Sequence, residues 1–294
     1  MRIFILENGG QNMSSITLIT CPHNEEKQLE GLIKNTRDVV DEIIVVAVQC
    51  NDGSVEVAKK NGARIMYSDN RISESNHKKG MENARTEWIL MMDPDERLSE
   101  ELKEEIKAAK NSTDADAFLI KRINFMMDGF APEKLAINSY VSRFFRKGHI
   151  LMKGIQHEHP EYLGKVKRLN GHMLHYSLTS IPVILEKTCF YSLETQDILE
   201  KQGKGNEMHQ IRDKWVVVLF GTRGFRKMFI FPIFSFFNHF FRHGLVFAGY
   251  RGFVIAAIAG FSAFLQEAYY WEKQSKRKKG ISIDWSQEYP EKSQ

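Results

Sequence analysis

The sequence predicts an α/β fold, with a mostly parallel sheet, helices on both of its faces, and a helical, apolar C-terminal region. Residues 16–110 alternate short apolar runs with stretches whose apolar residues recur at helical spacing, which is the order of a βαβ sheet. The run of residues 42–48 is continuously apolar, as is typical of a strand that helices cover on both faces. After residue 213 the chain becomes rich in Phe, Ile and Val, so a separate C-terminal region is expected.

Each expected element rests on a local pattern. Apolar and β-branched runs bounded by turn residues predict the strands, and apolar residues three and four positions apart predict the helices. Asn24 is expected to cap the first helix, residues 51–53 to form a turn, and Gly62 to close the second helix. The expected strands span 16–20, 42–48, 64–67, 88–92, 117–123 and 139–145, and the expected helices span 24–40, 54–61, 74–85, 99–110 and 181–202.

The composition indicates a folded protein of ordinary charge. Charged residues make up 27% of the 294-residue chain, hydrophobic residues 43%, and the net charge is +4, so a nucleic-acid partner is not expected. The three cysteines, Cys21, Cys50 and Cys189, are widely spaced and form no CxxC pattern, which favours reduced thiols in the cytoplasm. The apolar run near the N-terminus is too short for a signal peptide and Glu7 interrupts it, so export is not expected.

The apolar run that starts at Trp88 breaks off into Asp93-Pro94-Asp95-Glu96. A buried strand that ends in two carboxylates places hard oxygen ligands at the carboxyl edge of the sheet, where open α/β sheets bind ligands. Mg²⁺ and Mn²⁺ prefer such ligands and often share their coordination with substrate phosphates. A simple polar turn, with the acids leading the helix from Ser99, is the alternative interpretation.

The C-terminal third combines apolar segments with basic residues. Residues 215–220, 228–241 and 244–265 are apolar, but Arg251 divides the longest of these segments. The part after the arginine has about fourteen apolar residues, fewer than the ~20 of a membrane span, which favours helices that lie in the plane of a membrane surface. The basic residues of 273–279 would then face anionic headgroups. A buried helical core or dimer interface with a solvated basic tail is the alternative.

Three segments occur in an informative order and spacing: residues 20–26, residues 41–54 with the turn Asn-Asp-Gly-Ser, and the acidic motif of residues 93–96. Together they resemble family 2 glycosyltransferases of the GT-A fold. Later segments resemble the subgroup that includes β-glucosyltransferases of the lipopolysaccharide inner core; they are residues 143–148, 156–158, 174–177 and 271–272. The resemblance implies a nucleotide-sugar-binding half at 14–125, an acceptor-binding half with the catalytic base at 126–205, and an amphipathic, membrane-associated helical region with a basic tail at 206–294.

The resemblance also implies metal-assisted, inverting transfer of a sugar from a nucleoside diphosphate, with a UDP-sugar as the expected donor. Asp95 is expected to be the principal ligand of a divalent cation, Mg²⁺ or Mn²⁺, and Asp93 a second ligand or a ribose contact. Glu158 matches the family's His-Glu position and is the expected base that deprotonates the acceptor hydroxyl. Pairing of Glu158 with His157 or Arg146 in a polar loop is the alternative.

The resemblance places a donor site around these acids. The expected donor-binding residues are Pro22, His23, Asn24, Glu25, Asp52, Arg71, Lys78 and Asp93. Residues expected to support the metal or to contact the acceptor are Glu96, Arg146, His157 and His175. The sequence departs from the family pattern at His23, which stands in place of Tyr, at Ala47, which stands in place of an acid, and at residues 48–50, which replace a small polar run. Residues 76–78 replace a Gln-Arg-Asn-like segment, so Lys78 or Arg71 is expected to meet the diphosphate.

The predicted function is therefore that of an inverting glycosyltransferase, peripheral on the cytoplasmic face of the membrane, that acts on a lipid-linked or lipopolysaccharide-core acceptor. The alternative is a degenerate, non-catalytic family member that binds a glycan or a partner protein at the membrane. The Asp-x-Asp and His-Glu pairs favour the enzyme, because a binding module needs neither. A nucleotidyltransferase is not favoured, since Gly9 and Gly10 precede the first strand instead of following it.

Overall fold

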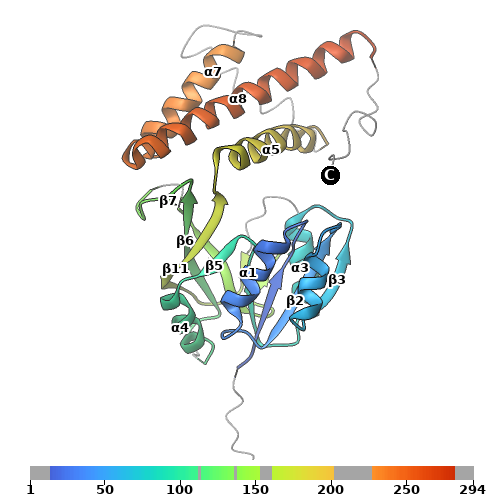
Figure 1. Ribbon diagram of the computed structural model, residues 1–294, viewed down its shortest axis with the longest axis vertical. Coiled ribbons are helices and arrows are strands. Elements are labelled where there is room, and N and C mark those ends of the chain that lie inside the picture. Colours follow the sequence, from blue (N-terminus) through green and yellow to red (C-terminus); the bar gives the residue numbers. More distant parts are fainter. Residues whose placement is uncertain (1–13, 112–113, 136–137, 153–160, 202–226, 282–294) are drawn as a thin grey trace, which may run out of the picture. The chain divides into compact units, whose positions relative to one another are not determined.

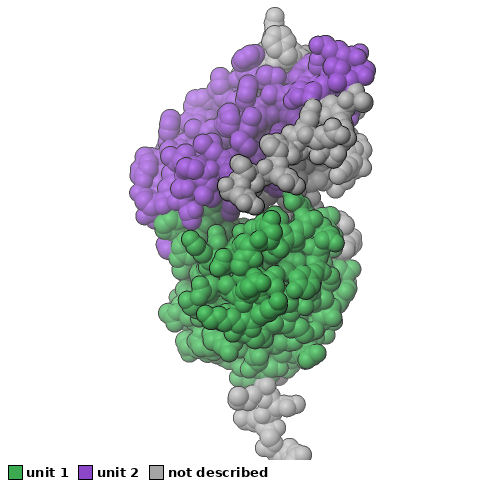
Figure 2. Space-filling view, turned by 45° about the vertical axis from the view of Figure 1, so that its right-hand side comes forward, with its two compact units in different colours: residues 1–125, 138–177 green, residues 126–137, 178–294 purple. Residues whose placement is uncertain are grey.

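The computed structural model describes residues 14–111, 114–135, 138–152, 161–201 and 227–281. The chain divides into two compact units, which Figure 2 shows in different colours. Unit 1 comprises residues 1–125 and 138–177, and unit 2 comprises residues 126–137 and 178–294.

Unit 1 alternates strands and helices along its first half, as the sequence predicts. Its elements are β1 (Ile16–Thr20), α1 (Glu26–Thr36), β2 (Glu42–Val48), α2 (Ser54–Lys60), β3 (Arg64–Ser68), α3 (Ser73–Asn83), β4 (Trp88–Met91), β5 (Glu96–Leu98), α4 (Glu100–Ala109), β6 (Ala117–Met126), β8 (Tyr140–Arg146), β9 (Ile150–Leu151), β10 (Glu161–Tyr162) and β11 (Val166–Leu178) (Figure 1).

The main sheet has the strand order β3-β2-β1-β4-β8-β6-β11-β5. The first four strands are parallel to one another. The pairs β4–β8, β8–β6 and β11–β5 are antiparallel. The α/β fold class expected from the sequence is confirmed, and the parallel strands are the ones that its apolar runs predict.

Side chains of the parallel strands alternate between two cores, one on each face of the sheet. Leu18, Val45 and Leu90 belong to a core that also contains apolar residues of α1, α2 and α4. Ile19 and Ile89, which point the other way, pack with the end of α3. Helices therefore cover both faces, with α1, α2 and α4 on one and α3 on the other.

An aromatic cluster lies at the centre of the first core. The fully buried Trp88 stacks on Phe144 at 4.6 Å between ring centroids, and Phe118 stacks on Phe144 at 5.6 Å. These three side chains come from β4, β8 and β6, so the cluster joins the parallel half of the sheet to the antiparallel half.

Local details differ from the expectations at three places. The residue before α1 is Glu25, so Asn24 does not cap this helix; Asn24 takes a left-handed conformation with φ 57°. Strands β5 and β11 were not expected, and they pair with each other through Met173 opposite Leu98. Ser99 caps α4 instead of lying within it, because its Oγ accepts a hydrogen bond from the backbone N–H of Leu102 at 3.2 Å.

Unit 2 is mainly helical. Its elements are β7 (Gly129–Phe130), α5 (Ile181–Lys201), α7 (Lys227–Phe237), the helical turn η2 (Asn238–Arg242), the short 3₁₀ helix η3 (Leu245–Ala248) and α8 (Gly249–Lys278). Helices α7 and α8 pack closely: a Cβ added at Gly260 of α8 would lie 2.9 Å from the carbonyl oxygen of Pro232 in α7. The basic residues 273–278, expected as a tail, are the last turns of α8.

The longest apolar segment of the sequence, residues 244–265, is divided in the structure between η3 and the first part of α8. Gly244 and Gly249, which have positive φ angles, flank η3. Among the described residues, the stretch Leu245–Lys278 is long and apolar enough to cross a membrane, judged by length and composition alone.

Candidate active site

The carboxyl ends of β1 to β4 lie along one edge of the sheet. The register aligns Ile19 with Ile44 of β2 and Met91 of β4, and Val48 with Ser68 of β3. Helices α1 and α2 cover one face and α3 the other, so the connections change sides between β1 and β4. Such a change of direction in an open α/β sheet opens a crevice for a ligand at the carboxyl ends of the strands.

The loops after β1 and β2 brace each other. The Oδ1 of Asn24 accepts a hydrogen bond from the backbone N–H of Asn51 at 2.8 Å, and the ring Nδ1 of His23 lies 2.7 Å from the carbonyl oxygen of Val48. Asp52 accepts bonds at 3.0 Å from the N–H groups of residues 26 and 54, at the starts of α1 and α2. Asn24 and Asp52 thus hold the shape of the expected donor loop, with Asp52 acting as a turn residue.

The remaining residues of the expected donor loop also lie at this edge. Pro22 accepts a hydrogen bond from the Cys50 thiol through its carbonyl oxygen at 3.2 Å, and Glu25 accepts one from the backbone N–H of His23 at 3.2 Å. The Nε of Arg71, after β3, donates to the Oε1 of Gln49, after β2, at 2.9 Å. The structure therefore brings Pro22, His23, Glu25 and Arg71 together along the ends of three neighbouring strands.

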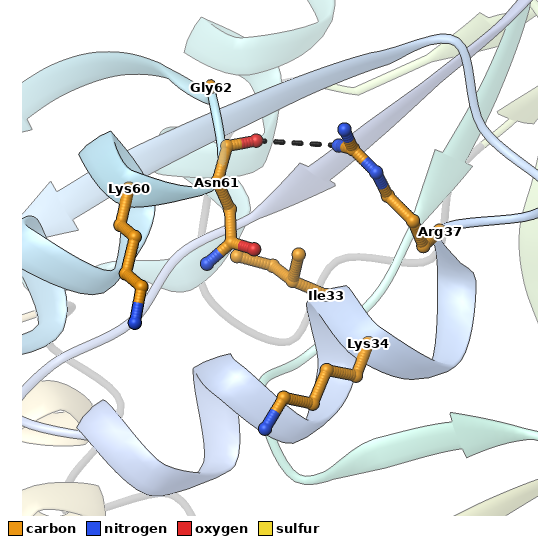
Figure 3. A pocket seen from close by; sticks show the side chains of 6 residues that line it. All are labelled: Ile33, Lys34, Arg37, Lys60, Asn61 and Gly62. Atoms are coloured by element: carbon orange, nitrogen blue, oxygen red, sulfur yellow. Dashed lines mark hydrogen bonds between the residues drawn. The ribbon is translucent and has the colours of Figure 1, made fainter.

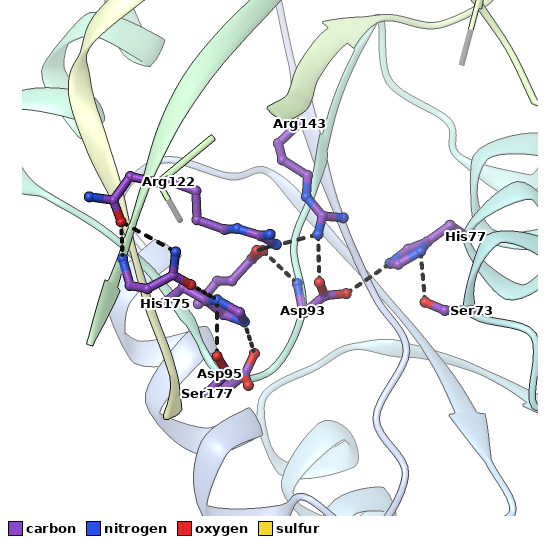
Figure 4. Close-up of polar contacts among 11 residues, drawn as sticks. Ser73, His77, Asp93, Asp95, Arg122, Arg143, His175 and Ser177 are labelled. Carbon is purple, nitrogen blue, oxygen red and sulfur yellow. Dashed lines mark hydrogen bonds and ion pairs between the residues drawn. The ribbon is translucent and has the colours of Figure 1, made fainter. Parts of the chain in front are cut away.

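Helix α3 contributes a residue that the sequence interpretation did not choose. His77, not its neighbour Lys78, is the residue that the structure brings to the acidic motif: its Nε2 lies 3.6 Å from the Oδ1 of Asp93 (Figure 4). Burial lowers the pKa of His77 to about 4, so the ring is neutral near pH 7.

The acidic motif forms a tight turn. The N–H of Glu96 donates to the carbonyl oxygen of Asp93 at 3.0 Å, and the N–H of Asp93 donates to the Oε2 of Glu96 at 2.9 Å. The Oδ2 of Asp93 accepts a hydrogen bond from Arg143 of β8 at 2.5 Å. Burial alone would raise the pKa of Asp93, but the charge of Arg143 outweighs it and lowers this pKa to about 2. Asp93 is therefore ionised and held by an arginine.

Glu96 belongs to the same charge cluster. Its carboxylate is fully buried and lies 3.3 Å from Arg143 and 3.5 Å from Arg122 of β6. Burial raises the pKa of Glu96 to about 7, although Arg143 opposes the shift. The alternative interpretation, in which the acids of the motif only lead the helix from Ser99, does not hold for Glu96, because this residue starts β5 and its carboxylate contacts Arg143 and Arg122.

Asp95 faces away from that cluster, toward His175 of β11. The Oδ1 of Asp95 lies 3.5 Å from the Nε2 of His175 (Figure 4). The Nδ1 of His175 lies 2.7 Å from the Oδ1 of Asn124, whose Nδ2 donates to Asn138 at 3.3 Å. Because an amide oxygen only accepts, the Nδ1 of His175 carries a proton; in the neutral form of the ring, the lone pair of Nε2 therefore faces Asp95.

These residues fit a divalent cation held by few protein ligands. A carboxylate oxygen and a histidine nitrogen face each other, and the second ring nitrogen is fixed by a hydrogen bond, as in metal-ligating histidines generally. No group of three or more His, Cys, Asp or Glu side chains suited to a metal occurs in the described part of the chain. A pair of protein ligands leaves positions for phosphate oxygens and water, which is usual for Mg²⁺.

Other expected residues lie elsewhere. Arg146 pairs with Glu87 and lies over the ring of Trp88, at the amino end of β4, so the structure does not bring it to the acids. Glu158 and His157 lie outside the described residues. The sequence interpretation missed four polar residues that lie within helix α3 and strands β6 and β8. They are His77, Arg122, Asn124 and Arg143.

A basic pocket lies at the opposite edge of the sheet, at the C-terminal ends of α1 and α2. Residues that line it include Lys34, Arg37 and Lys60, and Arg37 donates to the carbonyl oxygen of Asn61 at 3.4 Å (Figure 3). It contains none of the acids or histidines described above, so the candidate active site is the carboxyl edge.

Comparison with known proteins identifies the family of the chain. The sequence model of Glycosyl transferase family 2 matches residues 17–164. An uncharacterized glycosyltransferase of Rickettsia typhi is 26% identical over 287 residues, which cover 92% of each chain. One from Rickettsia bellii is 27% identical over 259 residues, covering 83% of this chain and 82% of that protein. The crystal structure of S. aureus TarS 1-349 has 14% identity and a TM-score of 0.40, with 90% of this chain and 92% of that chain covered. The chain belongs to glycosyl transferase family 2 and is a glycosyltransferase.

Proposed function

We propose that this glycosyltransferase moves a sugar, with inversion and with the help of Mg²⁺ or Mn²⁺, from a UDP-sugar to a lipid-linked or lipopolysaccharide-core acceptor. The observation that carries the donor half of the proposal is the pair Asp95–His175 at the carboxyl edge, with 3.5 Å between a carboxylate oxygen and an imidazole nitrogen. This refines the expectation from the sequence, in which Asp93 was the second ligand of Asp95.

In this proposal the two acids of the motif have different tasks. Asp95 and His175 hold the cation, which neutralises the diphosphate as it becomes the leaving group. Asp93 stays ionised because Arg143 lowers its pKa to about 2, and it fixes the turn that aims Asp95. The loops of Pro22–Glu25 and Gln49–Asp52 hold the nucleoside, since they line the same edge.

The acceptor half of the proposal rests on the resemblance and on unit 2. Inversion requires a base on the face of the sugar opposite the diphosphate, and Glu158 is the proposed base. A lipid-linked acceptor lies at a membrane surface, which suits an enzyme whose C-terminal helices expose many large apolar side chains. We therefore place the protein at the cytoplasmic face of the membrane as a peripheral enzyme.

Calorimetric titration with UDP, with and without Mn²⁺, tests the donor half. We expect the wild type to bind UDP in a Mn²⁺-dependent manner. Changes to the hydrogen-bond partners of metal ligands cost ~10-fold in affinity, so Asp95→Asn and His175→Gln, which change proposed ligands themselves, should lose at least that much. Asp114→Asn, at an exposed carboxylate that pairs with Lys167 at 3.3 Å, is the matched control and should bind as the wild type does. Undiminished Mn²⁺-dependent binding by Asp95→Asn would refute the metal site. Binding without any sugar transfer would favour the non-catalytic module.

A further inference from the structure

Unit 2 carries an exposed apolar stripe along α7 and the turn that follows it. Ile233, Phe237 and Phe241 are four residues apart, so they lie on one side of the helix. Their exposed fractions are 59%, 51% and 59%, and Phe247 in η3 is 80% exposed. We infer that this stripe is a docking surface that inserts into the interfacial layer of an anionic lipid bilayer.

The other side of the same helix explains why the stripe is not simply a part of the core. Phe236 and Phe240 stack on each other at 5.5 Å and pack edge-on against Phe253 of α8. Helix α7 lies beside α8 (Figure 1), and it carries apolar side chains both where it contacts α8 and where it is exposed. A surface helix of a soluble protein has polar residues on its outward side, so the stripe requires a partner that is itself apolar.

The charge pattern identifies the partner. Residues 227–266 contain no Asp or Glu, whereas they include Lys227, Arg242 and Arg251. Arg242 directly follows Phe241 and is exposed, so a cation borders the stripe. Cations beside inserted aromatic residues are the pattern of helices that lie on anionic membranes.

A second copy of the chain is a poorer occupant on the same grounds. In a symmetric dimer the same surface contacts itself, so the exposed Arg242 at the border of the stripe would approach the Arg242 of the other copy. Arg251 already pairs with Asp128 at 3.6 Å, whereas anionic headgroups would supply negative charge to Arg242. The inference rests on the proposed function only in that a lipid-linked acceptor lies in the surface to which the stripe would bind.

Vesicle sedimentation of the full chain tests the inference without any sugar transfer. The probe is phosphatidylglycerol–phosphatidylcholine vesicles, compared with vesicles of phosphatidylcholine alone. We expect preferential sedimentation with anionic vesicles, and a loss of about tenfold or more in the partition coefficient of the double variant Phe237→Ser, Phe241→Ser, because each Phe contributes a large apolar surface. Tyr67→Ser, at an exposed aromatic residue of β3 in unit 1, is the matched control and should sediment as the wild type does.

The outcomes separate the alternatives. Mn²⁺-dependent UDP binding by the double variant shows that unit 1 is folded, and sedimentation equal to that of the wild type would then overturn the inference. Self-association of the wild type without vesicles, abolished in the double variant, would show that a second copy covers the stripe and would also overturn it. If the wild type binds vesicles and the double variant does not, the docking surface is supported. This result is independent of the donor site, which undiminished UDP binding by Asp95→Asn would refute.

Discussion

Asn124→Leu tests the claim that a hydrogen bond fixes the tautomer of His175. Asn124 is buried in β6, and its Oδ1 lies 2.7 Å from the Nδ1 of His175. Leucine has a similar volume but accepts no hydrogen bond, so the ring is then free to carry its proton on Nε2. That proton would point toward Asp95, at the position that the cation is proposed to take.

The expected magnitude follows from the contacts that remain. Changes to the hydrogen-bond partner of a metal-ligating histidine typically cost 10- to 100-fold in metal affinity, or about 1.4 to 2.8 kcal/mol. The cost in folding stability should be smaller, about 1 kcal/mol, because Asn138 keeps its hydrogen bond from the backbone N–H of residue 124 at 3.0 Å. The variant should therefore fold and yet bind Mn²⁺ weakly.

The assay is titration of Mn²⁺ in the presence of saturating UDP, followed by electron paramagnetic resonance of free Mn²⁺. Ser177→Ala is the control in the same strand as His175: its Oγ contacts the same ring nitrogen at the longer distance of 3.3 Å, and its loss should change the affinity by less than about threefold. Wild-type Mn²⁺ affinity in a folded Asn124→Leu protein would refute the tautomer argument.

Two further predictions concern the stability of unit 1. Burial opposes ionisation of Glu42, but hydrogen bonds from Thr17 and from the N–H of Arg85 outweigh it and lower its pKa. A carboxyl group whose pKa is lowered in the native state stabilises the fold at pH values above its unfolded pKa, near 4.5, and this stabilisation disappears as the pH falls through the native pKa. In urea unfolding, Glu42→Gln should therefore have a lower free energy of unfolding than the wild type at pH 7, and this difference should shrink toward pH 3. Trp88→Ala removes the ring that stacks on Phe144, so it should lower the free energy of unfolding by about 3–5 kcal/mol in urea denaturation at pH 7. Removal of an exposed aromatic side chain should lower it much less. An equal loss in Tyr67→Ala would contradict this reasoning.

The parallel half of the fold was predictable because its signals are local. Each of its four strands is marked by a short run of mostly apolar residues, and the helix after the first strand has apolar residues at helical spacing. Strand β11 was missed for the opposite reason: most of its thirteen residues are exposed or half-buried, and it pairs with a strand some seventy positions earlier in the chain. The three residues of β5 are too few to show any period at all.

The candidate site was predictable in its location but not in its partners. A strand that ends in Asp-x-Asp marks the carboxyl edge, and the structure places the motif there. The sequence does not show that Arg143, fifty residues later in the chain, donates a hydrogen bond to Asp93, or that His175 faces Asp95. Both partners come from antiparallel strands that pair with segments far away in the sequence. The local sequence pattern therefore could not predict that the two acids have different roles.

The two acids differ because their surroundings differ, although only Pro94 separates them. Asp93 and Glu96 share Arg143, and their backbone and side chains bond each other, so the turn has one geometry. That geometry leaves Asp95 as the acid of the motif that faces His175. An arginine beside a proposed cation site would by itself repel the cation, but the ionised Asp93 pairs with Arg143 and offsets its charge. The charge cluster is therefore best understood as the support that aims Asp95, while Asp95 and His175 remain for the cation and the diphosphate.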